Sequence, residues 1–241
     1  MARKAIVVGA TSGIGRAFAL LLAQKGYVVG ITGRRAHLLK EIVDSDPPHY
    51  IAKQFDIDNY HSVETNLSEL CDQLKGVELL VLCSGTGNRN PELKLEHETN
   101  VVKTNVLGFV AVVNWAYKYF EAKGGGSLAA ISSIAGIRGF SVSPSYSGSK
   151  AYQMRYLEAL RQKANTYGKL VSITDIRAGF VDTAMGNGPG AFWISSPEKA
   201  AKQILNSIEK KRSVVYITKR WFLIAWLLRV MPNFIFERIK I

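Results

Sequence analysis

Tyr146 and Lys150 lie four positions apart in a segment with helical spacing, so their side chains are expected on one face of a helix. Such a pair suits proton transfer to a carbonyl group, because a ketone that accepts hydride becomes an alkoxide and needs a proton donor. A free tyrosine, with a pKa of about 10, donates poorly at neutral pH. We expect the ammonium group of Lys150 to favour the phenolate and to lower the pKa of Tyr146 toward the working range.

Two further polar residues precede this pair. Ser133 follows a short apolar run and stands 13 residues before Tyr146, and its hydroxyl would orient a substrate carbonyl and stabilise developing charge. Asn105 lies in a helical segment. Each residue alone also fits an ordinary structural role: a turn residue at Ser133, a polar helix residue at Asn105, a half-buried ring at Tyr146 or a solvated charge at Lys150. The prediction therefore depends on their order and spacing.

A glycine-rich segment separates the first apolar run from the first helical segment. Gly9 would allow a tight turn, Gly13 would let the backbone approach a pyrophosphate, and Gly15 would let the helix pack close to the strand. The N–H groups and dipole at the start of that helix favour phosphate. We predict a dinucleotide site that uses Gly9, Thr11, Ser12, Gly13, Ile14 and Gly15. The alternative is a glycine-rich turn without a ligand.

The second apolar run ends in a pair of arginines. A site specific for NAD usually carries Asp or Glu at the position of Gly33, to hold the ribose 2′-hydroxyl, whereas Arg34 and Arg35 follow here. Guanidinium groups suit a 2′-phosphate, so this turn favours NADP over NAD; the alternative is an exposed basic turn. Asp56, with Ile57 after it, would hydrogen-bond the adenine amino group or cap the following helix.

Short apolar, β-branched runs alternate with segments of helical spacing along the chain. Strands are expected at residues 5–8, 27–32, 50–55, 77–82, 127–131, 170–176 and 214–217, and helices at residues 14–25, 36–43, 62–74, 101–122, 146–167 and 197–210. This alternation predicts an α/β domain with a parallel sheet covered on both faces. Ligands bind such sheets at the carboxyl ends of the strands, where the glycine-rich segment lies.

The glycine segment together with Asn105, Ser133, Tyr146 and Lys150 resembles the short-chain dehydrogenase/reductase family over residues 3–217. The resemblance implies a single Rossmann-like, doubly wound domain, residues 1–217, with a seven-stranded parallel sheet and helices on both faces. It implies that Lys150 binds the nicotinamide ribose and that Asn105 holds a water of a proton relay. It also implies a homo-oligomer, either a dimer or a tetramer.

The resemblance assigns further cofactor contacts to Ser84, Gly85, Val181 and Thr183. Two positions depart from the family pattern. Ala178 replaces the usual proline beside the nicotinamide, so this turn loses a fixed φ angle. Cys83 replaces an asparagine that ties neighbouring strands together, and we interpret it as a packing residue rather than a reactive thiol.

The loop after Thr183 covers the substrate in this family. Its glycines indicate a mobile lid, and Met185, Phe192 and Trp193 indicate an apolar pocket, where Ser133 and Tyr146 would meet the carbonyl. An apolar or acyl-bearing ketone, such as a 3-ketoacyl compound or 3-ketosphinganine, is therefore expected. The alternative is a loop packed on its own core.

The formal net charge is +12, and it is concentrated at the two ends of the chain. Residues 1–40 carry seven basic and no acidic side chains, and residues 209–241 carry eight basic and two acidic ones. The basic amphipathic extension, residues 218–241, mixes tryptophans with arginines, which suits peripheral contact with a membrane surface. Pro232 should break any helix there. Alternatively, the extension packs on its own subunit, on a neighbour, or over the substrate channel.

Several classes of protein do not fit this composition. The uncharged run at residues 221–228 is too short to span a bilayer, which argues against a transmembrane protein. The two cysteines make no disulfide framework, and the four histidines are scattered and form no metal site. No nucleic-acid motif appears. We predict an NADP-dependent ketone reductase in the cytoplasm or at the inner face of a membrane. The alternative function is a catalytically idle NADP-binding regulator or scaffold, in which a broken Ser–Tyr–Lys set would be expected.

Overall fold

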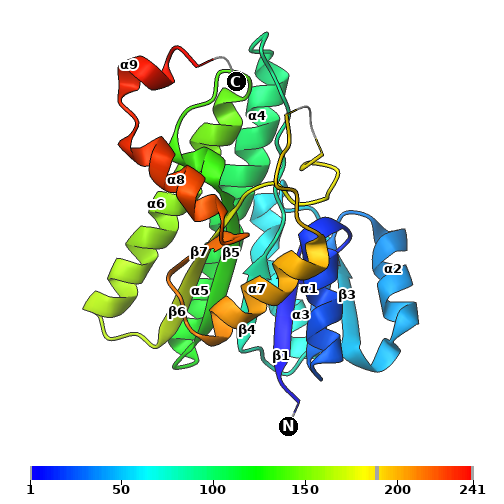
Figure 1. Ribbon diagram of the computed structural model, residues 1–241. Coiled ribbons are helices and arrows are strands. Elements are labelled where there is room, and N and C mark those ends of the chain that lie inside the picture. The colour runs from blue at the N-terminus through cyan, green and yellow to red at the C-terminus, as the bar shows by residue number, and fades with distance from the viewer. Residues whose placement is uncertain (1, 188–189, 240–241) are drawn as a thin grey trace.

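The computed structural model describes residues 2–187 and 190–239 and contains a seven-stranded sheet (Figure 1). All strand pairs are parallel, in the order β3-β2-β1-β4-β5-β6-β7, which confirms the predicted doubly wound, Rossmann-like α/β architecture. The strands are β1 (Lys4–Val8), β2 (Val28–Gly33), β3 (Tyr50–Gln54), β4 (Leu79–Leu82), β5 (Gly126–Ser133), β6 (Val171–Ala178) and β7 (Val214–Ile217). They match the expected runs to within a few residues.

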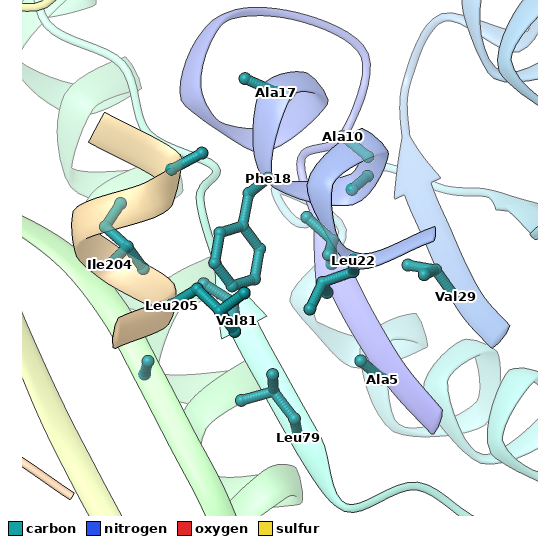
Figure 2. Close-up of a cluster of buried hydrophobic side chains, with 14 of the residues drawn as sticks. Ala5, Ala10, Ala17, Phe18, Leu22, Val29, Leu79, Val81, Ile204 and Leu205 are labelled. Atoms are coloured by element: carbon teal, nitrogen blue, oxygen red, sulfur yellow. The ribbon is translucent and has the colours of Figure 1, made fainter. Parts of the chain in front are cut away.

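The central strands are buried on both faces because helices cover each side of the sheet. On one face, α1 (Gly13–Gln24) and α7 (Pro197–Glu209) pack over β1 and β4, with α2 (Ala36–Ser45) beyond them. Figure 2 shows this cluster, where Phe18 and Leu22 of α1 meet Ile204 and Leu205 of α7 above Val81. Burying these side chains is the main source of stability for this half of the fold.

On the opposite face lie α3 (Val63–Gln73), α5 (Phe109–Ala122) and α6 (Pro144–Thr166). Their apolar faces form a second buried cluster against the strands. The helices contribute Leu67, Val113 and Leu157 to it, and the strands contribute Ile6, Leu80 and Leu128. Short 3₁₀ turns at Pro47–His49, Tyr60–Ser62 and Ile134–Ile137 join the main elements.

The helix expected at residues 101–122 begins earlier than predicted. Helix α4 (Leu95–Val102) runs into a π-helical segment, Lys103–Gly108, which continues directly into α5. The start was missed because the first turn is polar; its Glu96 and Glu98 suit a helix N-terminus through the dipole rather than through an apolar repeat. The π-helical segment places Asn105 at its centre.

The described part of the extension after β7, up to residue 239, contains two helices, α8 (Trp221–Val230) and α9 (Asn233–Phe236), which Pro232 separates as expected. In the described ranges, no helix is both long and apolar enough to cross a bilayer. The expected substrate loop and the extension each include residues outside those ranges, at 188–189 and 240–241 respectively.

Candidate active site

The predicted site residues gather at the carboxyl edge of the sheet. Ser133 ends β5, and Ala178 ends β6 beside it in register. The glycine-rich segment follows β1, and Cys83 and Ser84 both donate their backbone N–H groups to Val8 O, at 2.8 and 3.1 Å. The parallel topology therefore brings together segments that are far apart in sequence.

The glycines hold the segment after β1 very close to its neighbours. Gly9 has φ +89°, and a Cβ atom there would lie 2.5 Å from Ser84 Oγ. A Cβ at Gly15 would lie 2.0 Å from Gly9 O, so α1 can pack against the strand only without a side chain at this position. Gly13 has φ +54°, and its Cβ would meet Thr183 Cγ2 at 2.9 Å. The turn therefore presents bare backbone at the start of α1, as a phosphate-binding segment requires.

The arginines after β2 lie across this turn. Arg35 Nη2 donates to Thr11 Oγ1 at 2.7 Å and to Ser12 Oγ at 2.8 Å, which holds a guanidinium group at the edge of the glycine-rich segment. A Cβ at Gly33 would lie 2.7 Å from Thr11 Cγ2. The position that usually carries an acidic residue thus has no room for one unless Thr11 moves.

Asp56 does not cap the helical segment that follows it, which has Asn59 and Ser62 at its N-caps, and its contact with adenine stays a prediction. Its Oδ1 accepts the backbone N–H of Asp58 at 3.0 Å, a local turn, and its Oδ2 lies 3.6 Å from Arg34 Nη1. Ile57 is buried, with its carbonyl oxygen against Gly108, and Ile14 packs on the cluster beneath α1. The residues predicted to contact adenine thus form one ion pair above apolar packing.

Tyr146 and Lys150 lie one turn apart on α6, as predicted. The Tyr146 ring packs on the backbone at Gly87, where a Cβ would lie 2.3 Å from Tyr146 Cδ2. Lys150 is buried and its Nζ lies 5.7 Å from the centre of the Tyr146 ring. Ser133 Oγ donates to Ala178 O at 3.2 Å and accepts from Ala135 N at 3.2 Å, which fixes the hydroxyl at the end of β5.

The expected lowering of the Tyr146 pKa is wrong for this structure. Burial raises the pKa of the Tyr146 phenol, and the neighbouring Ser133 hydroxyl offsets this only in part. Burial also lowers the pKa of Lys150 to about 8, although the Asp175 carboxylate opposes this change. Desolvation dominates here because both groups are removed from water, so the phenol keeps its proton at neutral pH.

Asn105 is fully buried in the π-helical segment and fastens it to its surroundings. Its Oδ1 accepts Thr86 N at 2.9 Å, and its Nδ2 donates to Thr86 O at 2.7 Å and to Ser149 Oγ at 3.0 Å. Gly85 lies beside it, since a Cβ there would be 3.4 Å from Asn105 Oδ1 and 3.5 Å from Lys150 Nζ. The two predicted catalytic residues therefore face the same small space.

Gln153, which the sequence reasoning missed, joins these two residues directly. Lys150 Nζ donates to Gln153 Oε1 at 3.0 Å and to Ile131 O at 3.0 Å, and Gln153 Nε2 donates to Asn105 O at 2.9 Å. Gln153 is 1% exposed. An amide at three positions after Lys150, on the same helix face, was the signal that could have identified it.

The substrate loop begins and ends at a short parallel bridge between Val181 and Ser195. Phe192 and Trp193 pack against Trp221 of α8, with ring centres 4.9 and 5.8 Å away, and Met185 is about half exposed. The two aromatic rings of the loop thus pack against the extension of the same chain, and the apolar substrate pocket stays a prediction.

The two departures from the family pattern leave the local strands intact. Ala178 keeps its sheet pairing on both sides, to Ser133 and to Ile217. Cys83 lies against Gly15 and packs on the apolar cluster, and burial raises the pKa of its thiol to about 12. The Cys83 thiol is therefore protonated at neutral pH and suited to packing.

Comparison with known proteins agrees with this arrangement. The sequence model of the family described as short chain dehydrogenase matches residues 3–190. The chain is 28% identical to an uncharacterized oxidoreductase of Myxococcus xanthus over 98% of this chain and 95% of that protein. It is 31% identical to the 3-oxoacyl-[acyl-carrier-protein] reductase of Homo sapiens, covering 74% of this chain and 76% of that protein.

Two further similarities extend the comparison. A probable NADP-dependent dehydrogenase of Haemophilus influenzae is 30% identical over 73% of this chain and 70% of its own length. Among solved structures, a short-chain dehydrogenase from Streptomyces avermitilis superposes with a TM-score of 0.82 at 22% identity, covering 94% of this chain and 93% of that one. The structural match supports the fold.

Proposed function

Because this chain belongs to the short-chain dehydrogenase family, we propose that it is an NADP-dependent carbonyl reductase that converts an apolar, lipid-like ketone to a secondary alcohol. The observation that carries the proposal is the intact set of Ser133, Tyr146 and Lys150 beside the glycine-rich segment, with Lys150 linked through Gln153 to Asn105. An idle regulator has no need for this set.

In the proposed reaction, NADPH held by the glycine-rich segment would supply the hydride for the carbonyl carbon. Ser133 and Tyr146 orient the carbonyl oxygen, and the Tyr146 phenol gives its proton to that oxygen as the alkoxide forms. Its raised pKa keeps Tyr146 in the protonated donor form before the reaction. Lys150, when protonated, stabilises the phenolate that remains, and Gln153 holds the ammonium in position.

The preference for NADP rests on the turn after β2. Arg35 places its guanidinium beside the hydroxyls of Thr11 and Ser12, and Arg34 lies next to it, so two cations would meet a 2′-phosphate. An acidic side chain at position 33, which would bind a 2′-hydroxyl, would require Thr11 to move. The name of the Haemophilus influenzae relative, a probable NADP-dependent dehydrogenase, supports the same preference.

The preference for an apolar ketone rests on the aromatic residues of the substrate loop, Phe192 and Trp193, beside Phe180. The relative named as a 3-oxoacyl-[acyl-carrier-protein] reductase supports a ketone carried on an acyl chain.

The test is the absorbance of NADPH, followed with long-chain 3-ketoacyl thioesters, 3-ketosphinganine and small ketones side by side, and with NADH in parallel. We expect NADPH oxidation with the long-chain ketones at a higher kcat/KM than with the small ones. If NADPH binds, as fluorescence would report, but is oxidised by no ketone of the panel, the protein is the idle binder instead.

We predict that kcat/KM for reduction falls as the pH rises through about 8, because Lys150 loses its proton there. Gln153→Glu would place a carboxylate beside the Lys150 ammonium group and raise the Lys150 pKa. The inflection of the kcat/KM profile should therefore move to higher pH. Gln153→Leu removes a hydrogen-bond acceptor from the charged form, so the inflection should move to lower pH. The measurement is the pH profile of kcat/KM.

A suitable control is Gln24→Glu, which makes the same charge change at an exposed position near the end of α1. Its profile should match that of the unmodified protein. An unchanged inflection in Gln153→Glu would show that Gln153 does not act on Lys150.

A further inference from the structure

Helix α8 exposes one apolar face although its opposite face is fully packed. The exposed members are Phe222, Leu223, Trp226, Leu227 and Val230, which are between 46% and 61% exposed. Their spacing places them on one side of the helix. On the other side, Trp221 and Ala225 are each 1% exposed. Both faces of α8 are therefore apolar, but only one of them is buried against the domain.

The orientation of this exposed face is fixed by contacts with the domain. Trp221 packs on Gly179, where a Cβ would lie 2.2 Å from Trp221 Cε2, and against Phe180 at 5.5 Å between ring centres. Arg138 donates to Met231 O at 2.6 Å and to Asn233 Oδ1 at 2.9 Å. Both helices of the extension are thus held in place at several points.

We define the apolar surface as six exposed apolar side chains of α8 and α9: Phe222, Leu223, Trp226, Leu227, Val230 and Phe234. Figure 1 shows both helices on the outside of the domain, with α9 near the end opposite the N-terminus. At the start of α8, Arg220 Nη2 donates to Trp193 O at 2.6 Å, and Phe192 contacts Trp221. The apolar surface therefore adjoins the substrate loop.

Exposed cations neighbour the apolar surface along the chain. Lys219, Arg220, Arg229 and Arg238 are exposed, and Glu237 is the one acidic residue in positions 218–241. A groove lined by Lys210, Arg212 and Lys219 reaches Phe222 between α7, β7 and α8. Apolar and aromatic side chains with flanking cations are the composition of helices that lie in the interface of an anionic bilayer.

A second copy of the chain fits this surface less well. A two-fold interface brings the same patch of both subunits together, so the flanking cations of one copy would face those of the other. Anionic lipid headgroups would neutralise these cations while the bilayer takes up the apolar side chains.

We propose that the apolar surface docks on an anionic lipid bilayer and that the adjoining substrate loop receives its ketone from the membrane. The docking of the apolar surface on a bilayer is inferred from the exposed face of α8 and its cations alone. The delivery of a ketone from the membrane to the loop rests on the proposed function. A bilayer contact at this place would let a long-chain ketone reach the loop without crossing water.

The test is co-sedimentation with vesicles of phosphatidylcholine alone and of phosphatidylcholine mixed equally with phosphatidylglycerol. We expect the protein to sediment with the mixed vesicles, and the double variant Leu223→Glu, Trp226→Glu to lose at least about tenfold in binding. Both positions are exposed, so the fold should persist, which thermal unfolding checks. A matched control is Tyr167→Glu, Leu170→Glu, at exposed apolar positions after α6; it should bind like the unmodified protein.

Turnover of a small water-soluble ketone separates this proposal from the proposed function. The Leu223→Glu, Trp226→Glu variant should keep that turnover while it loses vesicle binding and its activity on a vesicle-borne ketone. Equal vesicle binding by this variant and the unmodified protein would overturn the docking proposal, as would an unmodified protein that stays in the supernatant. A dimer that the variant converts to a monomer, with no vesicle binding, would assign the surface to a second copy. Vesicle binding without any ketone turnover would leave docking in place and reject the reductase.

Discussion

Tyr146→Phe should lower kcat for ketone reduction by about 10²–10⁴-fold, the usual contribution of a general acid, while NADPH binding persists. The variant removes only the phenol oxygen, and the ring keeps its packing against the backbone at Gly87. Folding should therefore survive. Single-turnover reduction under saturating NADPH measures the loss directly, and tryptophan fluorescence follows the binding of NADPH.

The control for this variant is Tyr152→Phe on the same helix. Tyr152 is 40% exposed and its ring stacks on Tyr156 with centres 5.7 Å apart, so the loss of its hydroxyl should leave kcat unchanged. If Tyr146→Phe retains substantial reduction, the proton comes from another group and the proposed role of Tyr146 fails.

Arg35→Ser should weaken NADPH binding by about 10–100-fold and leave NADH binding nearly unchanged. A hydrogen bond to a charged group is worth about 1.5–3 kcal/mol, and each 1.4 kcal/mol corresponds to tenfold in affinity. In this variant the guanidinium that Thr11 and Ser12 hold beside the glycine-rich segment is missing, so a 2′-phosphate would lose its partner. Fluorescence titration with each cofactor gives both dissociation constants.

Lys40→Ser provides the matched control, because Lys40 is an exposed cation on α2 that pairs with Asp44. It should change neither constant. Equal weakening of NADPH and NADH by Arg35→Ser would mean that Arg35 supports the fold of the turn instead of recognising a phosphate, and the preference for NADP would lose its basis.

Most of the sheet could be predicted from the sequence because its strands are short, continuously apolar and separated by helices. β4, for example, is buried at all four positions, and its neighbours in the sheet have similar runs. The tight contact between Gly15 and Gly9 O also follows from local spacing, since the turn between a strand and a helix leaves no room for a Cβ at Gly15. These features depend on residues that are near one another in the chain.

Features that depend on contacts between distant segments could not be predicted. Within the π-helical segment, Asn105 O accepts Gln153 Nε2, an interaction across 48 positions that no local pattern reveals. The direction of the Tyr146 pKa shift depends on such contacts as well. The sequence places a cation one turn away, but burial, which only the packed structure determines, has the larger effect.

The contact between Trp221 and Gly179 determines how the extension can be engineered. A chain shortened at residue 218 would lose a fully buried indole, and deleting a buried aromatic side chain of this size typically costs about 3–5 kcal/mol. That is a large share of the roughly 5–15 kcal/mol that stabilises a typical domain. The extension, although last in the chain, therefore packs into the folded domain. A truncated form would be less stable than the full chain, so a change in its binding could not be assigned to the surface of α8. Substitutions on the outer face of α8 are therefore the appropriate way to separate its surface from its structural role.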